Sequence, residues 1–229
     1  MLQLECVAKI YGHKVIFKEI SCCVAPGSVT LVAGANGAGK STLMRVMAGL
    51  SRPSAGRVIV SDDVRVGYLG HATFLYPGLT AVENLSFWNR AYGLSLSTGE
   101  LGKVLARVGL EAYSQERVGC FSRGMAQRLN LARVLMQNPD LLLLDEPCSG
   151  LDTSSQTQLR QEIQAARHRG ACVVLISHDL MADGPLADHL LVLARHRLSY
   201  SGPPQNYAGL TENMALSVSG VEGGASCCT

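Results

Sequence analysis

The feature that most limits how this chain can fold is a glycine-rich segment between a predicted strand and a predicted helix. The segment consists of Gly34, Ala35, Asn36, Gly37, Ala38, Gly39, Lys40, Ser41 and Thr42. Residues 29–33 before it are apolar and β-branched, and residues 42–50 after it are typical of a helix. A strand, a glycine-rich loop and a helix in this order are the context of a phosphate-binding P-loop.

The residue types in this segment suit a nucleoside triphosphate. Glycines let the backbone wrap closely around phosphate oxygens, and the helix that follows adds free N–H groups and the positive end of its dipole. Lys40 is predicted to reach the β- and γ-phosphates, and the Ser41 hydroxyl to bind Mg²⁺. A mere glycine-rich turn with an exposed lysine is the alternative, and the spacing and flanking segments disfavour it.

Composition excludes several classes of protein. The chain has 229 residues, of which 47% are apolar, enough for a substantial core. No run reaches the roughly 18 uninterrupted apolar residues that a membrane-spanning helix needs. The formal net charge is only +2, so the sequence predicts no nucleic-acid partner. The first residues lack a charged segment followed by a long apolar one, so no signal peptide is expected.

The eight cysteines include no CxxC pair and none at zinc-site spacing from histidines. Several lie in apolar, strand-like runs, which predicts reduced thiols that pack as small core residues. Cys227 and Cys228 lie in a small, polar segment, residues 213–229, that we expect to be flexible. For this pair, lipidation, metal binding and an inert chain end remain open.

Hydrophobic patterning predicts an α/β fold. Helices are expected at 80–92, 98–110, 111–117, 122–138 and 154–169, the first with a capping box of Thr80 and Glu83. Strands are expected at 2–10, 14–24, 57–60, 64–69, 141–145, 171–176, 190–193 and 198–200. Continuous apolar strands alternating with helices imply a parallel core sheet covered on both faces, and the early alternating strands imply an added antiparallel layer. We expect one domain over residues 1–212, with a helical insert at approximately 80–138.

Two adjacent carboxylates follow the apolar run 141–144. A carboxylate at the C-terminal end of a buried parallel strand lies at the ligand-binding edge of the sheet. Asp145 is predicted to hold Mg²⁺, and Glu146 to activate the water that attacks the γ-phosphate. An Asp-Glu-Pro turn without function is the alternative, which becomes improbable after a P-loop.

Several motifs in a fixed order resemble those of ABC-transporter ATPases. Residues 121–133 resemble the signature segment, 149–152 the D-loop, and 176–179 the switch-histidine segment. The resemblance covers residues 2–202. It implies an ABC-type ATPase that binds ATP and couples its hydrolysis to transport. It further implies that Lys40, Glu146 and His178 take part in catalysis, with His178 at the γ-phosphate, and that Tyr11 stacks on adenine.

The residue types of the signature segment suit the binding of an anion. Ser122 and Gly124 begin a predicted helix, whose hydroxyl, N–H groups and dipole make an anion site. In the family, two ATPase domains pair head to tail and each signature meets the partner's γ-phosphate, which implies a homodimer here, with Asp152 of the D-loop among the nucleotide-site residues. Arg123 and Met125 replace the usual glycine and glutamine. Ser122 is also expected to be an N-cap, and the two roles are compatible.

A further departure lies in the segment from Tyr68 to Leu85, where Gly70-His71 stands in place of the usual glutamine. This segment resembles the ATP-binding subunit of the bacterial haem exporter of cytochrome c biogenesis (CcmA type). That resemblance implies permease subunits of the haem-exporter B and C type as partners, at the cytoplasmic face of the bacterial inner membrane. His71 is predicted to bridge the metal's water and the γ-phosphate, and a haem ligand is the alternative.

The loop from His71 to Thr80 is predicted to dock the membrane partner, because it gathers large apolar side chains next to a nucleotide-sensing residue. These side chains are Phe74, Leu75, Tyr76 and Leu79. Packing against the helix that begins after Thr80 is the alternative.

Other functions also stay open. One is the ATPase of a drug, antibiotic or lipid exporter. Another is a soluble ABC ATPase acting on ribosomes or DNA, although such proteins typically carry two cassettes or a long coiled-coil insertion. A third is a regulatory module without turnover, against which Glu146 and His178 argue.

Overall fold

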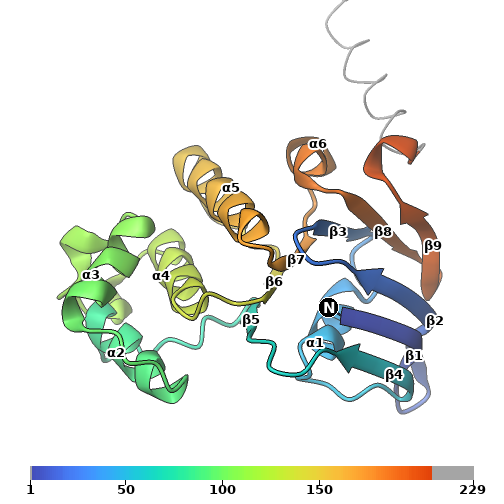
Figure 1. Cartoon of the computed structure of the whole chain (residues 1–229), viewed down its shortest axis with the longest axis horizontal. Coiled ribbons are helices and arrows are strands. Elements are labelled where there is room, and N and C mark those ends of the chain that lie inside the picture. The colour runs from blue at the N-terminus through green and yellow to red at the C-terminus, as the bar shows by residue number, and fades with distance from the viewer. Residues whose placement is uncertain (1, 208–229) are drawn as a thin grey trace, which may run out of the picture.

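The computed structural model describes residues 2–207 and contains two β-sheets (Figure 1). An antiparallel sheet has the order β2-β1-β4, from β1 (Leu2–Tyr11), β2 (Lys14–Val24) and β4 (Ala55–Val60). The central sheet has the order β5-β6-β7-β3-β8-β9, from β3 (Val29–Gly34), β5 (Val66–Leu69), β6 (Leu141–Asp145), β7 (Cys172–Ile176), β8 (His189–Ala194) and β9 (Arg197–Gly202). The predicted flexible segment, with Cys227 and Cys228, lies outside the described residues.

The central sheet is parallel except at one edge, where β9 runs antiparallel to β8. Every residue of β6 and β7 is buried, because alternate side chains enter the cores on the two faces of the sheet. On one face lie α1 (Lys40–Met47) and the antiparallel sheet, which share a core with Leu141 and Leu143. This arrangement confirms the predicted fold class.

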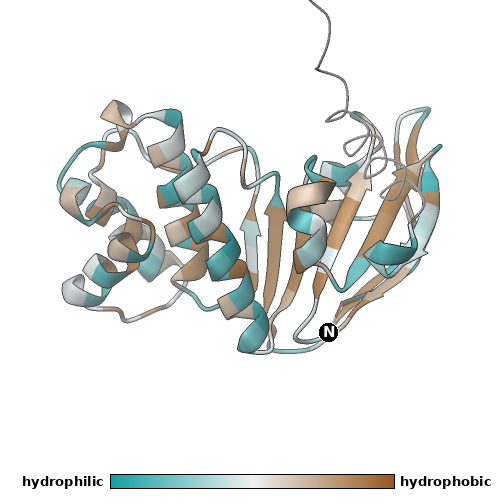
Figure 2. Cartoon of the chain, turned by 90° about the horizontal axis from the view of Figure 1, so that it is seen from above, coloured by the Kyte–Doolittle hydropathy of each residue, from teal (hydrophilic) through white to brown (hydrophobic). Residues whose placement is uncertain are grey.

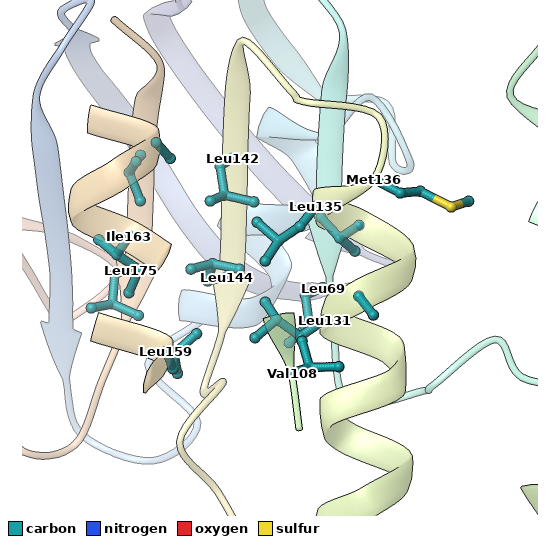
Figure 3. Close-up of a cluster of buried hydrophobic side chains, with 14 of the residues drawn as sticks. Leu69, Val108, Leu131, Leu135, Met136, Leu142, Leu144, Leu159, Ile163 and Leu175 are labelled. Carbon is teal, nitrogen blue, oxygen red and sulfur yellow. The ribbon is translucent and has the colours of Figure 1, made fainter. Parts of the chain in front are cut away.

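The other face of the central sheet is covered by α4 (Arg123–Leu135) and α5 (Thr153–His168). Figure 3 shows the contact, with Leu131 and Leu135 of α4 on one side of Leu142 and Leu144 of β6, and Leu159 and Ile163 of α5 on the other. Figure 2 shows that the strands of the central sheet are mostly hydrophobic, whereas the helices beside them carry both hydrophilic and hydrophobic residues. No helix among residues 2–207 is long and apolar enough to cross a membrane.

The helical insert combines α2 (Ala81–Ala91), α3 (Thr98–Arg107) and α4, which pack together away from the antiparallel sheet (Figure 1). The predicted capping box is confirmed: the Thr80 N–H donates to Glu83 Oε2 at 2.8 Å, and the Glu83 N–H donates to Thr80 Oγ1 at 3.3 Å. A short helix, α6 (Leu180–Asp183), follows β7. Single 3₁₀ turns span Glu111–Tyr113, Val118–Cys120, Gly184–Leu186 and Pro204–Asn206.

The helix predicted over 111–117 is wrong, because only Glu111–Tyr113 forms a 3₁₀ turn. The carbonyls of Ser114 and Glu116 accept hydrogen bonds from Val82 and Ala81, so the first turn of α2 takes the acceptors that a continuing helix would need. The neighbouring helix ends at Arg107 rather than residue 110, because Gly109 adopts a φ of +65°, outside the helical region.

Candidate active site

The glycine-rich loop lies between β3 and α1, as predicted, and its backbone requires glycine at two points. Gly34 has a φ of +144°, and a Cβ there would lie 2.4 Å from the Leu193 carbonyl oxygen. Gly39 has a φ of +102°, and a Cβ there would lie 2.9 Å from Ile16 Cγ2. The conformation that wraps the loop around its centre therefore excludes side chains at these positions.

Lys40, the first residue of α1, is buried with its ammonium turned into the loop. Its Nζ donates to the Gly34 carbonyl at 2.8 Å and to the Ala35 carbonyl at 3.2 Å. The loop thus holds a cation at its centre beside the N–H groups of the helix start, and an incoming phosphate would replace these carbonyls as the acceptor.

The loop opens into a cleft of about 220 Å³. Its lining includes six residues of the motif, Asn36, Gly37, Gly39, Lys40, Ser41 and Thr42, together with Glu146. It also includes Lys14, Val15, Ile16 and His196, which sequence reasoning missed. These residues come from β2 and from the turn between β8 and β9, and His196 Nδ1 lies 3.0 Å from the Ile16 carbonyl oxygen.

Three side chains meet at the carboxyl ends of the parallel strands. The Ser41 hydroxyl donates to Asp145 Oδ1 at 3.1 Å, and His71 Nε2 lies 3.8 Å from Asp145 Oδ2. Asp145 is buried, and within residues 2–207 its Oδ2 has no hydrogen-bond partner. Burial raises the pKa of the Asp145 carboxyl, while the hydrogen bond from Ser41 acts in the opposite direction.

This donor set fits a divalent cation. Ligand atoms of His71, Asp145 and Glu146 all lie within 4.8 Å of one another. A cation among them would give the free Asp145 oxygen a partner and would favour the ionised carboxylate that burial disfavours. Hydroxyl and carboxylate oxygens are ligands that Mg²⁺ accepts.

Glu146 and His178 are paired at the ends of the neighbouring strands β6 and β7. His178 Nε2 lies 2.6 Å from Glu146 Oε1. The Glu146 backbone has a φ of +52°, in a region that non-glycine residues seldom occupy, and its N–H donates to the Ile176 carbonyl at 3.1 Å. Strained backbone of this kind concentrates at sites where a side chain must be aimed.

The signature and D-loop residues lie together, but none lines the P-loop cleft of the same chain. Ser122 is the N-cap of α4 and accepts from the Met125 N–H at 3.2 Å, while Arg123 Nη2 donates to Ser149 Oγ at 3.2 Å. A Cβ on Gly124 would lie 3.2 Å from the Gly150 carbonyl oxygen, so the two segments are in close contact.

Asp152 is the N-cap of α5 and accepts from the Ser155 N–H at 2.8 Å. That bond lowers the pKa of the Asp152 carboxyl. Tyr11, at the end of β1, is half-exposed with Lys9 Nζ 4.8 Å from its ring centre, and it does not line the cleft.

The loop that carries His71 is fastened to the helical insert. Asn84 accepts from the Tyr76 N–H at 2.8 Å and donates to the Tyr76 carbonyl at 3.0 Å, and Trp88 Nε1 donates to the Phe74 carbonyl at 3.0 Å. These bonds hold the backbone while Phe74 and Tyr76 keep 48% and 45% of their surfaces exposed. Leu75, in contrast, packs against the core.

Beneath this loop lies Arg133 of α4, a buried cation that sequence reasoning missed. Its guanidinium lies 5.5 Å from the Phe74 ring centre and 5.0 Å from that of Trp88. It also donates to the Tyr68 carbonyl at 3.1 Å and to the Tyr92 hydroxyl. Arg133 therefore connects the signature helix to the loop on both sides of His71.

Comparison with known proteins gives one consistent family. The family model described as "ABC transporter" matches residues 17–149. The linearmycin resistance ATP-binding protein of Bacillus subtilis is 35% identical over 190 residues, which cover 78% of this chain and 61% of that protein. A zinc import ATP-binding protein of Halorhodospira halophila is 36% identical over 207 residues, covering 89% of this chain and 78% of that protein.

Among solved structures, a similar one is described as the dimeric, post-hydrolysis state of the ATP-binding cassette MJ0796 bound to ADP and Pi. The TM-score is 0.78 at 23% identity, and the alignment covers 90% of this chain and all of that one. At this level of identity, the similarity supports the fold.

Proposed function

This chain belongs to the ABC transporter family and is an ATPase of that type, and from this premise we propose that it powers a transmembrane permease by hydrolysing ATP between two copies of itself. The observation that carries the proposal is the meeting of Lys40, Ser41, Asp145, Glu146 and His178 at one edge of the central sheet.

Each of these groups would have a role in binding or hydrolysing ATP. The loop from Gly34 to Thr42 would hold the phosphates with its N–H groups, and Lys40 would place its charge on the β- and γ-phosphates. Ser41 and Asp145, with His71 beside them, would hold Mg²⁺, which when bound offsets the charge of the phosphates.

Glu146 would act as the general base for hydrolysis. Its carboxylate would take a proton from the attacking water, whose oxygen then bonds to the γ-phosphorus as the bond to the ADP oxygen breaks. The contact of 2.6 Å with His178 would aim that carboxylate and leave the imidazole close to the γ-phosphate. Tyr11, which lies outside the cleft lining, would contact the adenine where the nucleotide extends beyond the cleft.

Pairing of two copies is supported by where the signature lies. Ser122, Gly124 and Asp152 are at the starts of α4 and α5, outside the cleft of their own chain. An anion site at the N-terminus of α4 would be used if a second copy presented its γ-phosphate there. We therefore propose a head-to-tail homodimer with two nucleotides between the copies.

The cargo is assigned from the loop alone. We propose haem export or cytochrome c maturation, with permease subunits of the haem-exporter B and C type at the cytoplasmic face of the bacterial inner membrane, on the resemblance of the His71 loop. An antibiotic exporter is the second candidate, supported by the relative described by linearmycin resistance. Identification of the membrane proteins that co-purify in mild detergent decides between the two.

The ATPase site is tested by Lys40→Ala. This change removes the buried cation at the centre of the loop, so ATP affinity and hydrolysis should both fall, hydrolysis by at least about 100-fold. Calorimetry with ATP and a phosphate-release assay measure the two effects. Lys103→Ala, on the exposed side of α3 and outside the cleft, is the matched control and should leave both nearly unchanged. Unchanged ATP binding in Lys40→Ala would contradict the assigned phosphate site.

A further inference from the structure

Near His178 lies a buried carboxylate that has no role in the proposed mechanism. Asp183, at the end of α6, is 1% exposed. Its Oδ1 accepts from Arg160 Nε at 2.9 Å, and its Oδ2 accepts from the Ser177 hydroxyl at 2.6 Å. Ser177 directly precedes His178 in the chain, and His178 contacts Glu146. The Asp183 carboxylate therefore holds the residue next to His178.

The hydrogen bonds around Ser177 fix the backbone on both sides of His178. The Ser177 hydroxyl also accepts from the Asp179 N–H at 3.0 Å, and Asp179 in turn caps α6 by accepting from the Ala182 N–H at 2.9 Å. The His178 side chain itself is half-exposed. Because neighbouring side chains cover only half of the imidazole, the orientation of the ring depends on this hydrogen-bonded backbone.

Arg160 brings a second element into the network. It lies on α5, the helix that Asp152 caps, and its hydrogen bond to Asp183 raises the pKa of the guanidinium, so the arginine stays charged. Arg160, Asp183, Ser177 and His178 line a cavity of about 250 Å³ that Glu146 also borders. A buried ion pair is weak evidence for a stabilising role, because desolvation offsets the attraction between the charges. Its place beside His178 suggests a positioning role instead.

We propose that Asp183, held by Arg160, is a positioning residue that fixes His178 against Glu146 through the Ser177 hydroxyl. The inference rests on the proposed role of His178 in turnover. Asp183 would not touch the nucleotide, so it would set kcat and leave ATP affinity unchanged. The network would also join the D-loop helix α5 to the catalytic pair, so that a shift of α5 reaches His178 through Arg160.

The test is a double-mutant cycle in the full chain. Asp183→Ala should lower kcat about tenfold with KM for ATP unchanged, the scale expected when the support of a functional group is lost. In a His178→Ala background the same change should have almost no further effect, because its route to Glu146 is already gone. Asp183→Asn keeps one acceptor oxygen for Ser177 but loses the ion pair with Arg160, so it should recover part of the lost kcat.

Glu162→Gln is the matched control, because Glu162 is also a carboxylate paired with an arginine (Arg107 Nε–Glu162 Oε1, 3.2 Å) and lies on α5, the helix that carries Arg160. It should leave kcat within about twofold. Ser177→Ala removes one hydroxyl and should show the same coupling to His178→Ala if Asp183→Ala does not fold. If Asp183→Ala lowers kcat by the same factor in the His178→Ala background as in the wild type, the inference is overturned and the proposed role of His178 stands. A normal kcat for His178→Ala would overturn both.

Discussion

Two aspartates show how the surroundings of one residue set its chemistry. Asp140 pairs with Arg65, with Arg65 Nε 3.1 Å from Oδ2, and this hydrogen bond lowers the pKa of the Asp140 carboxyl. Asp145, at the other end of β6, is buried, no cationic side chain among residues 2–207 is in hydrogen-bond contact with it, and burial raises the pKa of its carboxyl. The two carboxyls therefore affect stability in opposite directions as pH changes.

This contrast predicts a difference in thermal unfolding measured without metal or nucleotide. A raised folded-state pKa gives Asp145 a stabilising effect below its unfolded-state pKa, which is lost as pH rises through the folded-state value. Asp145→Asn should therefore have a higher Tm than the wild type at pH 7, and the two should converge near pH 4.

Asp140→Asn is the control of opposite sign. The lowered pKa of Asp140 contributes stability above its unfolded-state pKa, so this variant should lose Tm at pH 7 and approach the wild type below about pH 3. A lower Tm for Asp145→Asn at pH 7 in metal-free buffer would contradict the assignment of Asp145 as a carboxylate waiting for a cation.

Residues with strong local patterns were placed by the sequence, while others were set only by packing. Ser41 and Asp145 were predicted to lie together because the carboxyl ends of parallel strands meet at one edge. His196 and Arg160 carry no such pattern. Each looks like a solvated charge in a turn or on a polar helix, and only the tertiary contacts bring them to the cleft and to Asp183.

At the scale of elements, the loop between β5 and α2 joins the nucleotide edge of the sheet to the helical insert. Its first residues lie beside Asp145, and its later residues are fastened to α2 by Asn84 and Trp88. The rings of Phe74 and Tyr76 are about half-exposed on this backbone, and the Tyr76 ring centre lies 4.7 Å from that of Phe87. A rigid loop with exposed aromatic rings suits contact with a partner.

The double variant Phe74→Ser, Tyr76→Ser tests this loop as the docking surface. It removes two exposed rings, so recovery of the membrane partners in mild detergent should fall at least about tenfold. ATP affinity measured by calorimetry should stay unchanged, because neither ring lines the cleft.

Ile59→Ser provides the comparison, since Ile59 is 42% exposed on β4 and should not affect the complex. If the double variant instead unfolds at a clearly lower temperature with no selective loss of complex, the rings serve the core, and the docking surface lies elsewhere.

Prediction of elements succeeded where the pattern was local. Thr80 with Glu83 marked the start of α2, and the apolar run at 141–144 marked β6. The segment after Tyr113 was predicted as helix on composition, but its carbonyls pair with the start of α2, a contact between distant parts of the chain. The contacts of Arg133 with Tyr68 and Phe74 could not be predicted either, because they also join distant parts of the chain.

At the scale of the whole molecule, the proposed catalytic groups are divided between two places. The P-loop and Glu146 line the cleft, with Asp145 bonded to Ser41 at its edge, while Ser122 and Gly124 lie at the start of α4 beside the D-loop. One chain would thus offer the proposed phosphate site at the P-loop and a separate proposed anion site at the start of α4. Two copies placed head to tail would complete both sites.

The most direct test is the mass of Glu146→Gln with and without Mg²⁺ and ATP, measured by light scattering. Glutamine keeps a hydrogen-bond partner for His178 but cannot take the proton from water, so turnover should fall about 10²–10⁴-fold while ATP stays bound. A head-to-tail homodimer that needs ATP should give a particle of twice the 24.4 kDa chain mass with ATP and of one chain mass without it. Adding Lys40→Ala should abolish the ATP-dependent dimer. A single-chain mass with ATP bound, or near-normal hydrolysis, would contradict the account.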